Sequence, residues 1–575
     1  MSRPGWLVSL LVGCVATAVA LRLQALIRDV WQIRSMPERV MEWLLLFVPL
    51  NLFERALQQF GPSAKDFALV GVVVGMSLVL VVLGTATVRA GWSSWRLLGI
   101  GVVLWLLTMA VVQPITGGGF FATGLLQSPL LVNAGYLLMF LAYASVLVTG
   151  RLLLERGPED RLRLLGERRA LLAGLVGTVG ALGVARFIGR DGGIVTSNLP
   201  LAAAPTRAPT RLPTRVPAAT AQATQAPLQV FSTPTAVAVF NNPTAEPLPV
   251  PAERQLARNQ DGSLTAAGRP SGTLAPLITA NQDFYVVTKN AIADPVVDGD
   301  GWRLIVDGEV ATPVQIDYRT LRALPSVEVT KTLECISNFT SQCKLAVFGC
   351  DLISTARWRG ARLSDVLDLA GGLKPSTVSL AFVSLDEFSA GLPPEVAQDD
   401  ETLVIYEMNG EPLPREHGYP ARLLVPGRYG MKNPKWLAVI RALPRDYLGW
   451  YEQRNWNKNG IVRTMARIDT PADGAVLGPG RQRIAGIAYA GSRGVVLVEY
   501  SADGGSTWAQ ALPLEPPPGR DAMVRWEGSF TLDEAETATL IVRATDGDGE
   551  VQTAQFTLPQ PDGATGRHSI QVYSA

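Results

Sequence analysis

The chain has 575 residues, of which 48% are hydrophobic, and this length is enough for three or four domains. Because 51 basic residues balance 50 acidic ones, the net charge of +1 gives no reason to expect a nucleic-acid partner. Four cysteines exclude a disulfide-rich scaffold, and two histidines are very few for the ligation of haem.

Uncharged apolar runs concentrate in residues 1–190 and predict an α-helical transmembrane anchor region. Residues 4–21 and 67–88 contain no charged side chain, and the second run is long enough to cross a bilayer. Residues 97–150 are uncharged throughout, which favours two spans joined by the glycines at 117–119. So many runs in so short a stretch argue against buried core helices of a soluble domain.

Two further segments set the predicted number of spans at five or six. Residues 170–185 form a shorter, Gly-rich fifth span. Residues 40–53, "VMEWLLLFVPLNLF", are either a sixth span or an interfacial amphipathic helix. The N-terminus is cytoplasmic with five spans and lies outside with six.

Arginine indicates the orientation of the anchor region. The predicted loop before the last span contains Arg151, Arg156, Arg161, Arg163, Arg168 and Arg169. This loop should be cytoplasmic, so we expect a multi-pass protein of the cell membrane whose C-terminal domains are extracytoplasmic. Residues 167–187, "ERRALLAGLVGTVGALGVARF", resemble a twin-arginine export signal, although ordinary positive-inside anchoring explains the same arginines.

A linker is predicted at residues 191–273. Residues 192–251 are rich in Pro, Thr and Ala and show no apolar periodicity. This composition favours an extended, polyproline-like spacer that tethers the following domains without fixing them to the membrane.

Residues 274–450 have the pattern of an α+β domain. Residues 302–310, "WRLIVDGEV", alternate as a strand that ends in a turn. Residues 362–372, "RLSDVLDLAGG", are typical of an amphipathic helix stopped by glycine. Residues 419–443 mix a strand, a Gly/Pro turn and basic side chains.

Three of the four cysteines lie in one stretch, "TLECISNFTSQCKLAVFGC", as Cys335, Cys343 and Cys350. A thiolate is a soft metal ligand, but this spacing has no nearby histidine and fits a zinc site poorly. Disulfides persist outside the cytoplasm, which favours a local bridge between Cys343 and Cys350. The alternative is three isolated buried thiols.

Five motifs agree with a known family in order and spacing: "TLECISN", "DLISTARWRGARLSDVLDLAGG", "LDEFSAGLP", "VIYEMNGEPLPREHGYPARLLVPGRYGMKNPKWL" and "VRTMARIDTPADGAVL". Together they resemble the sulfite oxidase family of molybdopterin-dependent oxidoreductases, and most closely its membrane-anchored prokaryotic branch. The resemblance runs from about residue 274 to the C-terminus. It implies a mixed α+β cofactor domain, a following immunoglobulin-like domain and a molybdenum–molybdopterin cofactor.

The resemblance also assigns site residues. Cys335 matches the cysteine whose thiolate binds molybdenum in the family. The other matched cofactor contacts are Tyr285, Val286, Asp386, His417, Arg422, Lys432, Asn433, Pro434 and Lys435. Arg422 and Lys435 would pair with the pterin phosphate, with help from Lys432. Taken alone, these cations would be ordinary solvated charges and the histidine an ordinary satisfied one.

Two departures from the family pattern weaken the case for sulfite as substrate. Well-known sulfite oxidases have a segment with an arginine just after the cysteine motif, whereas Phe339 and Thr340 follow Asn338 here. Phe388 stands where sulfite oxidases place a tyrosine near the metal. Phenylalanine cannot donate a hydrogen bond to sulfite. The remaining candidates for an anion pocket are Arg357, Arg359, Arg362, Arg428 and Arg454, with Arg428 and Arg454 assigned as catalytic beside Cys335. Each alone is also explained as a surface arginine.

Residues 451–575 are predicted to form an immunoglobulin-like β-sandwich, because short alternating strands are separated by Asp-Gly and Gly-Gly turns. Trp508 and Trp526 are expected in its core. In the family this domain mediates dimers, which implies a homodimer; a monomeric accessory domain is the alternative.

The resemblance therefore implies a membrane-tethered, extracytoplasmic oxidoreductase that transfers an oxygen atom and two electrons. Sulfite oxidation is the leading reaction, and reduction of a sulfoxide such as methionine sulfoxide is the alternative in the same family. A non-enzymatic surface-binding module is the alternative outside it. No haem is expected, because the chain has no C-x-x-C-H motif and no histidine in the membrane segments. Electrons then need a separate partner, a cytochrome or a quinone-linked protein.

Overall fold

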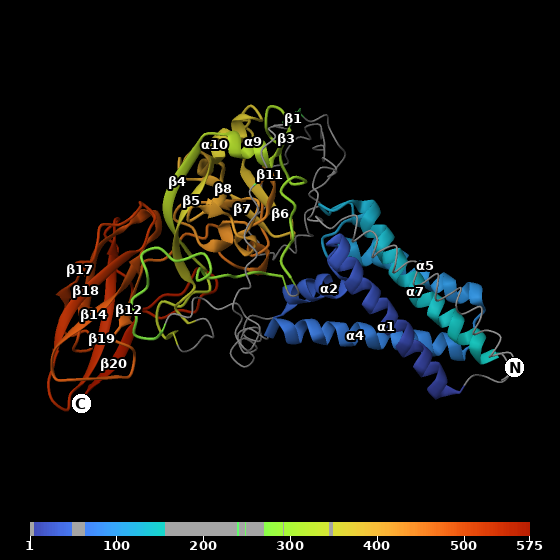
Figure 1. Ribbon diagram of the computed structural model, residues 1–575, viewed down its shortest axis with the longest axis horizontal. Helices are drawn as coiled ribbons and strands as arrows, with labels where there is room; N and C mark the ends of the chain where they lie inside the picture. The colour runs from blue at the N-terminus through green and yellow to red at the C-terminus, as the bar shows by residue number, and fades with distance from the viewer. Residues whose placement is uncertain are drawn as a thin grey trace, which may run out of the picture. The chain divides into compact units, whose positions relative to one another are not determined.

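The computed structural model describes residues 5–48, 64–155, 238–240, 248, 270–290, 293–343 and 349–575. The chain divides into two compact units, Met1–Val48 with Lys65–Ala236, and Pro49–Ala64 with Val237–Ala575. The described part of the first unit is helical, and that of the second is built mainly of β-sheets (Figure 1). The predicted twin-arginine segment and most of the predicted linker lie outside the described residues.

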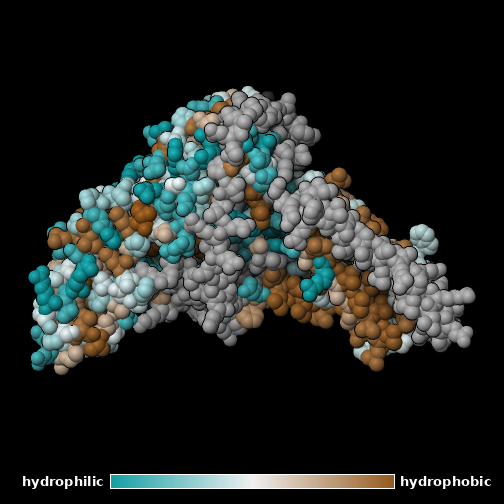
Figure 2. All heavy atoms as spheres, viewed as in Figure 1, coloured by the Kyte–Doolittle hydropathy of each residue, from teal (hydrophilic) through white to brown (hydrophobic). Residues whose placement is uncertain are grey.

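Four long apolar helices make up most of the helical unit. Its helices are α1 (Trp6–Trp31), α2 (Met36–Leu44), α4 (Ala64–Arg89), α5 (Ser94–Leu107), α6 (Gln113–Ile115) and α7 (Pro129–Glu155), with short turns at Leu45–Phe47, Thr108–Val112 and Phe120–Ala122. The four membrane-length stretches are Trp6–Trp31, Asp66–Arg89, Ser94–Ile115 and Pro129–Leu154, and as little as 6% of one of them is buried. Their exposed surface is largely hydrophobic (Figure 2). Side chains such as Leu78, which is 60% exposed, suit a lipid environment, so the unit is suited to anchor the protein in a membrane.

The prediction of five or six spans is corrected to four in the part of the chain that the structure describes. The described residues of the stretch 40–53, which end at Val48, do not form a span, because α2 ends at Leu44 after nine residues and continues as a short 3-10 turn. Nine helical residues cover only about 14 Å, less than half of the hydrocarbon core of a bilayer. Residues 170–185 lie outside the described residues. The two helices predicted within residues 97–150 are present.

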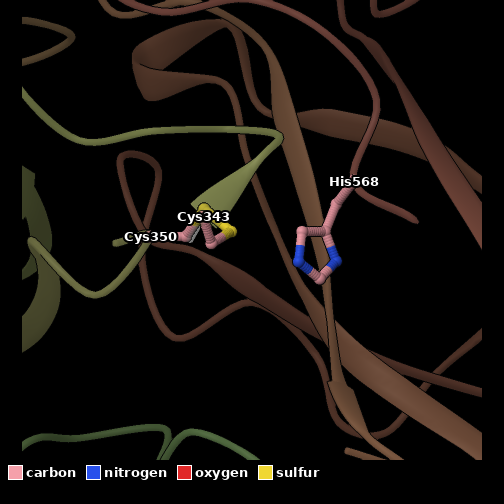
Figure 3. Close-up of side chains that lie close together, drawn as sticks. All are labelled: Cys343, Cys350 and His568. Atoms are coloured by element: carbon pink, nitrogen blue, oxygen red, sulfur yellow. A yellow bond between two sulfur atoms is a disulfide. The ribbon is translucent and has the colours of Figure 1, made fainter. Parts of the chain in front are cut away.

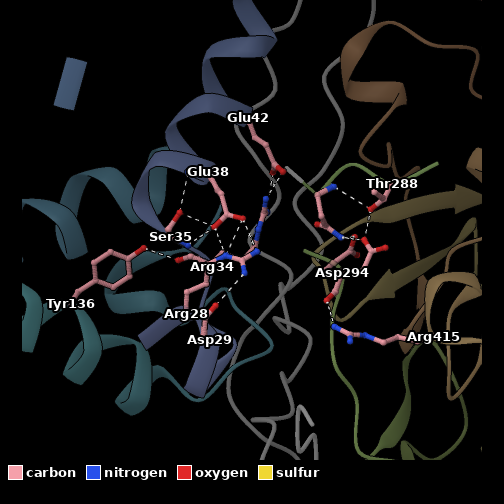
Figure 4. A network of polar contacts seen from close by, with 12 residues as sticks. Arg28, Asp29, Arg34, Ser35, Glu38, Glu42, Tyr136, Thr288, Asp294 and Arg415 are labelled. Atoms are coloured by element: carbon pink, nitrogen blue, oxygen red, sulfur yellow. Dashed lines mark hydrogen bonds and ion pairs between the residues drawn. The ribbon is translucent and has the colours of Figure 1, made fainter. Parts of the chain in front are cut away.

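Buried ion pairs explain why α2 packs in the helical unit instead of crossing the bilayer (Figure 4). Ser35 caps the helix, and its side chain and backbone bond with Glu38 in a capping box. Glu38 is 1% exposed and accepts from Arg28 at 3.1 Å. Arg34 and Glu42 form a second pair. Charges buried in a membrane protein require such partners.

The first part of the β-rich unit contains two sheets, one mixed and one antiparallel. Its strands are β1 (Ala238–Phe240), β2 (Arg303–Gly308), β3 (Val314–Asp317), β4 (Ser326–Glu334), β5 (Ile353–Arg362), β6 (Ser379–Ser384), β7 (Ser389–Leu392), β8 (Leu403–Met408), β9 (Glu411–Pro412), β10 (Arg422–Leu424) and β11 (Leu437–Leu443). One sheet has the order β1-β3-β2-β11-β6-β7, and the other has β10-β8-β5-β4 with β9 paired to β8. Helices α9 (Tyr318–Ala323) and α10 (Leu363–Asp368) complete the expected α+β pattern.

The second part of the β-rich unit is a pair of sheets around one core. Its strands are β12 (Met465–Thr470), β13 (Ala475–Leu477), β14 (Gly480–Tyr489), β15 (Val495–Ser501), β16 (Ala509–Gln510), β17 (Leu512–Pro513), β18 (Val524–Leu532), β19 (Thr537–Asp546) and β20 (Ser569–Ser574). The sheet orders are β12-β14-β18-β17 and β13-β20-β19-β15-β16. Trp526 is 1% exposed in the shared core, as expected. Trp508 is not in the core, and it is half-buried with the guanidinium of Arg543 4.1 Å from its ring.

Strand β4 connects the two parts of this unit. Lys331 on β4 is buried and pairs with Asp521 at 3.2 Å. The Tyr489 hydroxyl donates to the Asp521 carboxylate at 2.8 Å and to the Thr332 carbonyl at 3.0 Å. A strand held along its length in this way presents the residue that follows it in a fixed position.

Candidate active site

A cleft opens where β4 ends, and we call it the Cys335 cleft. Its volume is about 740 Å³, open solvent at its mouth included. The lining comes from residues within 284–289, 333–336, 384–388 and 430–436, together with His417, Arg422 and Tyr451. Segments far apart in sequence thus meet at one end of the β4 strand.

Cys335 is held at the first position after β4. It is a free thiol that is 9% exposed, and its amide donates to the Leu352 carbonyl at 2.9 Å. Asn338 fixes the turn that follows, because it donates to the Glu334 carboxylate at 2.9 Å and accepts from the Leu352 amide at 3.0 Å. Burial raises the pKa of the Cys335 thiol to about 11, against hydrogen bonds from Ser337 that lower it. The cleft therefore presents one positioned sulfur, a soft ligand for a metal.

Arg422 is a buried cation in the same cleft. Its guanidinium donates to the His417 carbonyl at 3.2 Å and to the Asn433 carbonyl at 3.0 Å. Its Nε is buried and has no hydrogen-bond partner among the described residues. Burial lowers the pKa of Arg422 to about 10, while Tyr285 raises it. A donor left over in a buried guanidinium is suited to an anionic or polar ligand.

Lys435 and His417 lie in the lining beside Arg422. The Lys435 ammonium donates to the Glu416 carbonyl at 2.8 Å and lies 4.3 Å from the centre of the Trp436 ring. Burial lowers the pKa of Lys435. The Nε2 atom of His417 lies 3.1 Å from the Asn281 carbonyl oxygen. These contacts fix both side chains at the wall of the cleft.

Asp386 joins a polar network with residues at the end of the lining segment 284–289 and just after it; Figure 4 shows Thr288, Asp294 and Arg415 of this network. Asn290 donates to Asp386 at 3.1 Å and to Asp294 at 3.0 Å. Asp294 also accepts from the Thr288 hydroxyl at 2.6 Å, and its carbonyl accepts from Arg415 at 3.0 Å. This network holds the segment that contains Tyr285 and Val286.

Asn433 shapes the turn that carries Pro434 and Lys435. Its side-chain oxygen accepts from the Val425 amide at 2.7 Å, and its amide group donates to the Tyr429 carbonyl at 2.9 Å. The residue is 1% exposed. Thus the structure brings eight of the nine predicted cofactor contacts to the lining together with Cys335: Tyr285, Val286, Asp386, His417, Arg422, Asn433, Pro434 and Lys435.

Lys432 is the predicted cofactor contact that does not line the cleft. Its side chain is fully buried, forms an ion pair with Glu452 and donates to the Gly391 carbonyl at 3.0 Å. Because its charge is neutralised inside the domain, Lys432 stabilises the fold and does not face a ligand.

The arginines proposed for an anion pocket also lie outside the lining. Arg428 donates to the Asn459 carbonyl, and the Arg454 guanidinium lies 3.6 Å from the centre of the Trp450 ring. The candidates on strand β5 are Arg357, Arg359 and Arg362. Arg359 and Arg362 are near carboxylates, at 3.6 Å and 3.4 Å. The sequence did not indicate these contacts, because each partner is distant in the chain or is a backbone carbonyl.

A family model described as "Oxidoreductase molybdopterin binding domain" matches residues 291–451. The mitochondrial sulfite oxidase of Macaca fascicularis is 35% identical over 268 residues, which are 41% of this chain and 49% of that protein. The sulfite oxidase of Gallus gallus is 31% identical over 318 residues, which are 48% of this chain and 68% of that protein. The chain belongs to the sulfite oxidase family of molybdopterin-binding oxidoreductases.

The match of this sulfite oxidase family member to its relatives is partial. The chain spans about half the length of the mitochondrial sulfite oxidases that it matches. Among solved structures, the sulfane dehydrogenase SoxCD from Paracoccus pantotrophus aligns with 58% of this chain and 92% of its own, at 22% identity and a TM-score of 0.47.

The cleft fits the molybdenum–molybdopterin cofactor that the family domain implies. Cys335 offers the one free thiol of the described β-rich unit. Arg422 retains a buried N–H with no partner among the described residues, and Lys435 adds a second cation for a phosphate. The donor set therefore has both a soft metal ligand and anion-binding groups in one cleft.

Tyr451 and Lys289 line the cleft but were missed in the sequence analysis. Tyr451 follows the last strand of its domain in an aromatic segment, "GWYEQRNW". That density of aromatic side chains after a strand is the signal that would have pointed to it. Lys289 carries no such signal, because its place in the lining depends on the polar network around Asp386.

A disulfide lies in the segment after Cys335. Cys343 and Cys350 are joined, with their Cα atoms 5.2 Å apart. His568 lies beside them, and potential ligand atoms of the three residues are within 4.8 Å of one another (Figure 3). Both sulfurs are used in the bridge, so the trio is not a metal site in this state. The Nδ1 atom of His568 accepts from the Ile468 amide at 3.1 Å, and burial lowers the pKa of the imidazole to about 4.

Proposed function

We propose that this chain is a membrane-anchored molybdenum–molybdopterin oxidoreductase, of the prokaryotic branch of its family, that oxidises sulfite. The observation that carries the proposal is the free Cys335 thiol in a cleft whose wall also holds Arg422 and Lys435. The net reaction is sulfite plus water to sulfate plus two protons and two electrons. When bound, the cofactor supplies two-electron redox chemistry and exchange of an oxygen atom.

The residues of the chain have distinct roles in this proposal. Cys335 binds the metal through its sulfur, and the turn at Asn338 keeps that sulfur in place. Arg422 and Lys435 hold the pterin phosphate as charge-assisted donors. The remaining lining contacts orient the pterin: Tyr285, Val286, Asp386, His417, Asn433 and Pro434.

The lining near Phe388 supports a second reaction, the reduction of a sulfoxide. Two electrons and two protons convert the sulfoxide to a sulfide and water. Phe388 lies in the lining, whereas Arg428 and Arg454 do not. A neutral sulfoxide needs less positive charge than sulfite does. Methionine sulfoxide is the form of this substrate that envelope proteins would present.

The location and partners follow from the anchor region. By the positive-inside rule we assign the arginine-rich stretch 151–169 to the cytoplasm, and the β-rich unit then follows on the other side after one further crossing at residues 170–185, which lie outside the described residues. The electron partner is a separate cytochrome or quinone-linked protein. The two-sheet β-domain is of immunoglobulin-like type and forms a homodimer.

The proposal is tested on the full chain, purified in detergent from a host that makes molybdopterin. Wild type should contain about one molybdenum and one pterin per chain. Cys335→Ser should lose most of the metal and all activity, whereas Cys14→Ser, which changes the other free thiol of the described chain, should keep both. Sulfite-dependent reduction of an artificial electron acceptor and sulfoxide-dependent oxidation of a reduced dye then decide the direction. The proposal would be contradicted by wild type that contains neither metal nor pterin, or by a fully active Cys335→Ser variant.

A further inference from the structure

Tyr451 is fixed in the lining of the Cys335 cleft by other aromatic rings. Its ring meets those of Phe388, Trp450 and Trp456 edge-on, with centroid distances of 5.7, 4.9 and 5.9 Å. Edge-to-face contacts of this kind favour one orientation of each ring. The Tyr451 side chain is therefore a rigid part of the cleft wall.

The hydroxyl of Tyr451 has no hydrogen-bond partner among the described residues, whereas two other polar groups of the surrounding segments are bonded. The Tyr429 hydroxyl accepts from the Arg463 amide at 3.0 Å. The Asp386 carboxylate accepts from the Phe388 amide at 3.0 Å. A rigid phenol that lines a cleft and forms no hydrogen bond with the described protein groups can donate one to a ligand.

Tyr285 is the other tyrosine in the lining, and its environment differs. Tyr285 is 7% exposed and stacks on Phe284 with a centroid distance of 5.5 Å. Tyr451 is only half-buried, so a small molecule that enters the cleft reaches it more readily. This difference fits a cofactor contact at Tyr285 and a substrate contact at Tyr451.

The charged groups around Tyr451 include one cation, Arg454, and one carboxylate, Asp386. Arg454 lies 3.6 Å from the centre of the Trp450 ring, and its guanidinium donates to the Trp450 carbonyl at 2.6 Å. The cation therefore acts on the cleft only through the field that it adds beside Tyr451. Phe388, which packs edge-on against the Tyr451 ring, offers no donor at all.

We propose that the Tyr451 hydroxyl donates a hydrogen bond to the sulfur-bound oxygen of the substrate and so makes Tyr451 a specificity-determining residue. This inference rests on the proposed function, and it holds for sulfite and for a sulfoxide, because both present an oxygen bound to sulfur. The tyrosine supplies the donor that Phe388 lacks.

Tyr451→Phe tests the inference, since it removes only the hydroxyl. In the full chain loaded with its cofactor, kcat/KM for the substrate that wild type turns over should fall about tenfold, the worth of a hydrogen bond to a charged or strongly polar group. The dissociation constant of an unreactive analogue should rise by a similar factor; sulfate serves for sulfite and dimethyl sulfone for a sulfoxide. Molybdenum and pterin per chain should stay at the wild-type level.

Tyr447→Phe is the matched control, because Tyr447 is buried in the same segment but does not line the cleft. It should leave kcat/KM and the analogue affinity unchanged. Phe388→Tyr in the Tyr451→Phe background should recover part of the lost affinity. The inference is overturned if Tyr451→Phe leaves both values at the wild-type level, or if it loses metal and pterin, which would show a structural role. Failure of the proposed function is distinguishable, since wild type itself would then lack cofactor or turnover.

Discussion

Arg422 is the side chain whose surroundings say most about the ligand of the cleft. A buried guanidinium is costly unless its donors are bonded. Two of its N–H groups reach backbone carbonyls, and the Nε has no partner among the described residues. An anionic ligand such as a phosphate would complete this set of hydrogen bonds and offset the cost of burial.

Replacing Arg422 by lysine should therefore weaken cofactor retention. The charge is kept, but the planar fork that reaches His417, Asn433 and a ligand at once is lost. We expect about tenfold weaker retention of pterin, measured as pterin per chain after dialysis. Arg359→Lys, at an exposed position of β5, is the control and should match wild type. Equal pterin content in both variants would contradict the assignment of Arg422.

His568 should make the stability of the β-rich unit depend on pH. The folded protein holds its imidazole neutral, with a pKa of about 4, whereas the unfolded chain protonates it near pH 6.5. Between these values the unfolded state binds more protons, so stability falls as the pH drops from 6.5 toward 4. The loss in the free energy of unfolding reaches about 3 kcal/mol. His568→Gln should flatten the dependence of the denaturation midpoint on pH in this window, and an unchanged slope would contradict it.

Cys335 could be singled out from the sequence because its motif is local and its chemistry is distinctive, and the structure places it as a free thiol in the lining of the cleft. Lys432 could not be placed correctly, because its partner Glu452 lies 20 residues further on and pairs with it only in the folded domain. Tyr451 belongs to no recognised motif and enters the cleft through ring packing. The place of a residue in the cleft was thus predictable where a short motif contains it, and not where a contact with a distant residue decides it.

At the scale of elements, the described part of the segment between Cys335 and β5 is held by backbone hydrogen bonds and one disulfide. The described part of it has the Phe339 amide donating to the Gly349 carbonyl at 3.2 Å, and the disulfide between Cys343 and Cys350 closes it. A cross-link that closes so short a loop removes conformations from the unfolded chain. The bridge therefore stiffens the wall next to the proposed metal ligand.

The double variant Cys343→Ser/Cys350→Ser should lower the free energy of unfolding of the β-rich unit by about 2 kcal/mol, as expected for a loop of this length. Denaturant titration of the full chain in detergent measures the change. Because Cys335 stays free, metal content should be preserved, and the control Cys14→Ser should show no loss of stability. An unchanged midpoint would mean that other contacts already fix the segment.

Regular elements were predicted where periodicity and stop signals agree. The helix predicted within residues 362–372 is α10, which spans Leu363–Asp368. Gly371 and Gly372 follow it with φ of 74° and 81°. The extra span at residues 40–53 was wrong because hydropathy does not register the capping box and the ion pairs that fix a short helix. Tertiary contacts, not composition, determine the length and the packing of α2.

At the scale of the whole molecule, the β-rich unit works as one body. The Lys331–Asp521 pair and the Tyr489 hydroxyl bind the C-terminal sheets to β4, the strand that leads to Cys335. The C-terminal domain thus supports the cleft directly. The helical unit carries four apolar helices and no histidine, so its part in the proposed function is to hold this body at a membrane.

The orientation of the chain can be tested by proteolysis of membrane vesicles. The predicted linker contains arginines at 207, 211 and 215, which are cleavage sites for trypsin. If the arginine-rich stretch 151–169 is cytoplasmic, trypsin added to right-side-out vesicles should release a soluble fragment that contains the β-rich unit with its pterin. Inside-out vesicles are the matched control and should release no such fragment, because trypsin there reaches only the cytoplasmic loop. Release from inside-out vesicles alone would place the Cys335 cleft in the cytoplasm, where its electron partner would have to be a soluble reductase or a protein on the inner face of the membrane.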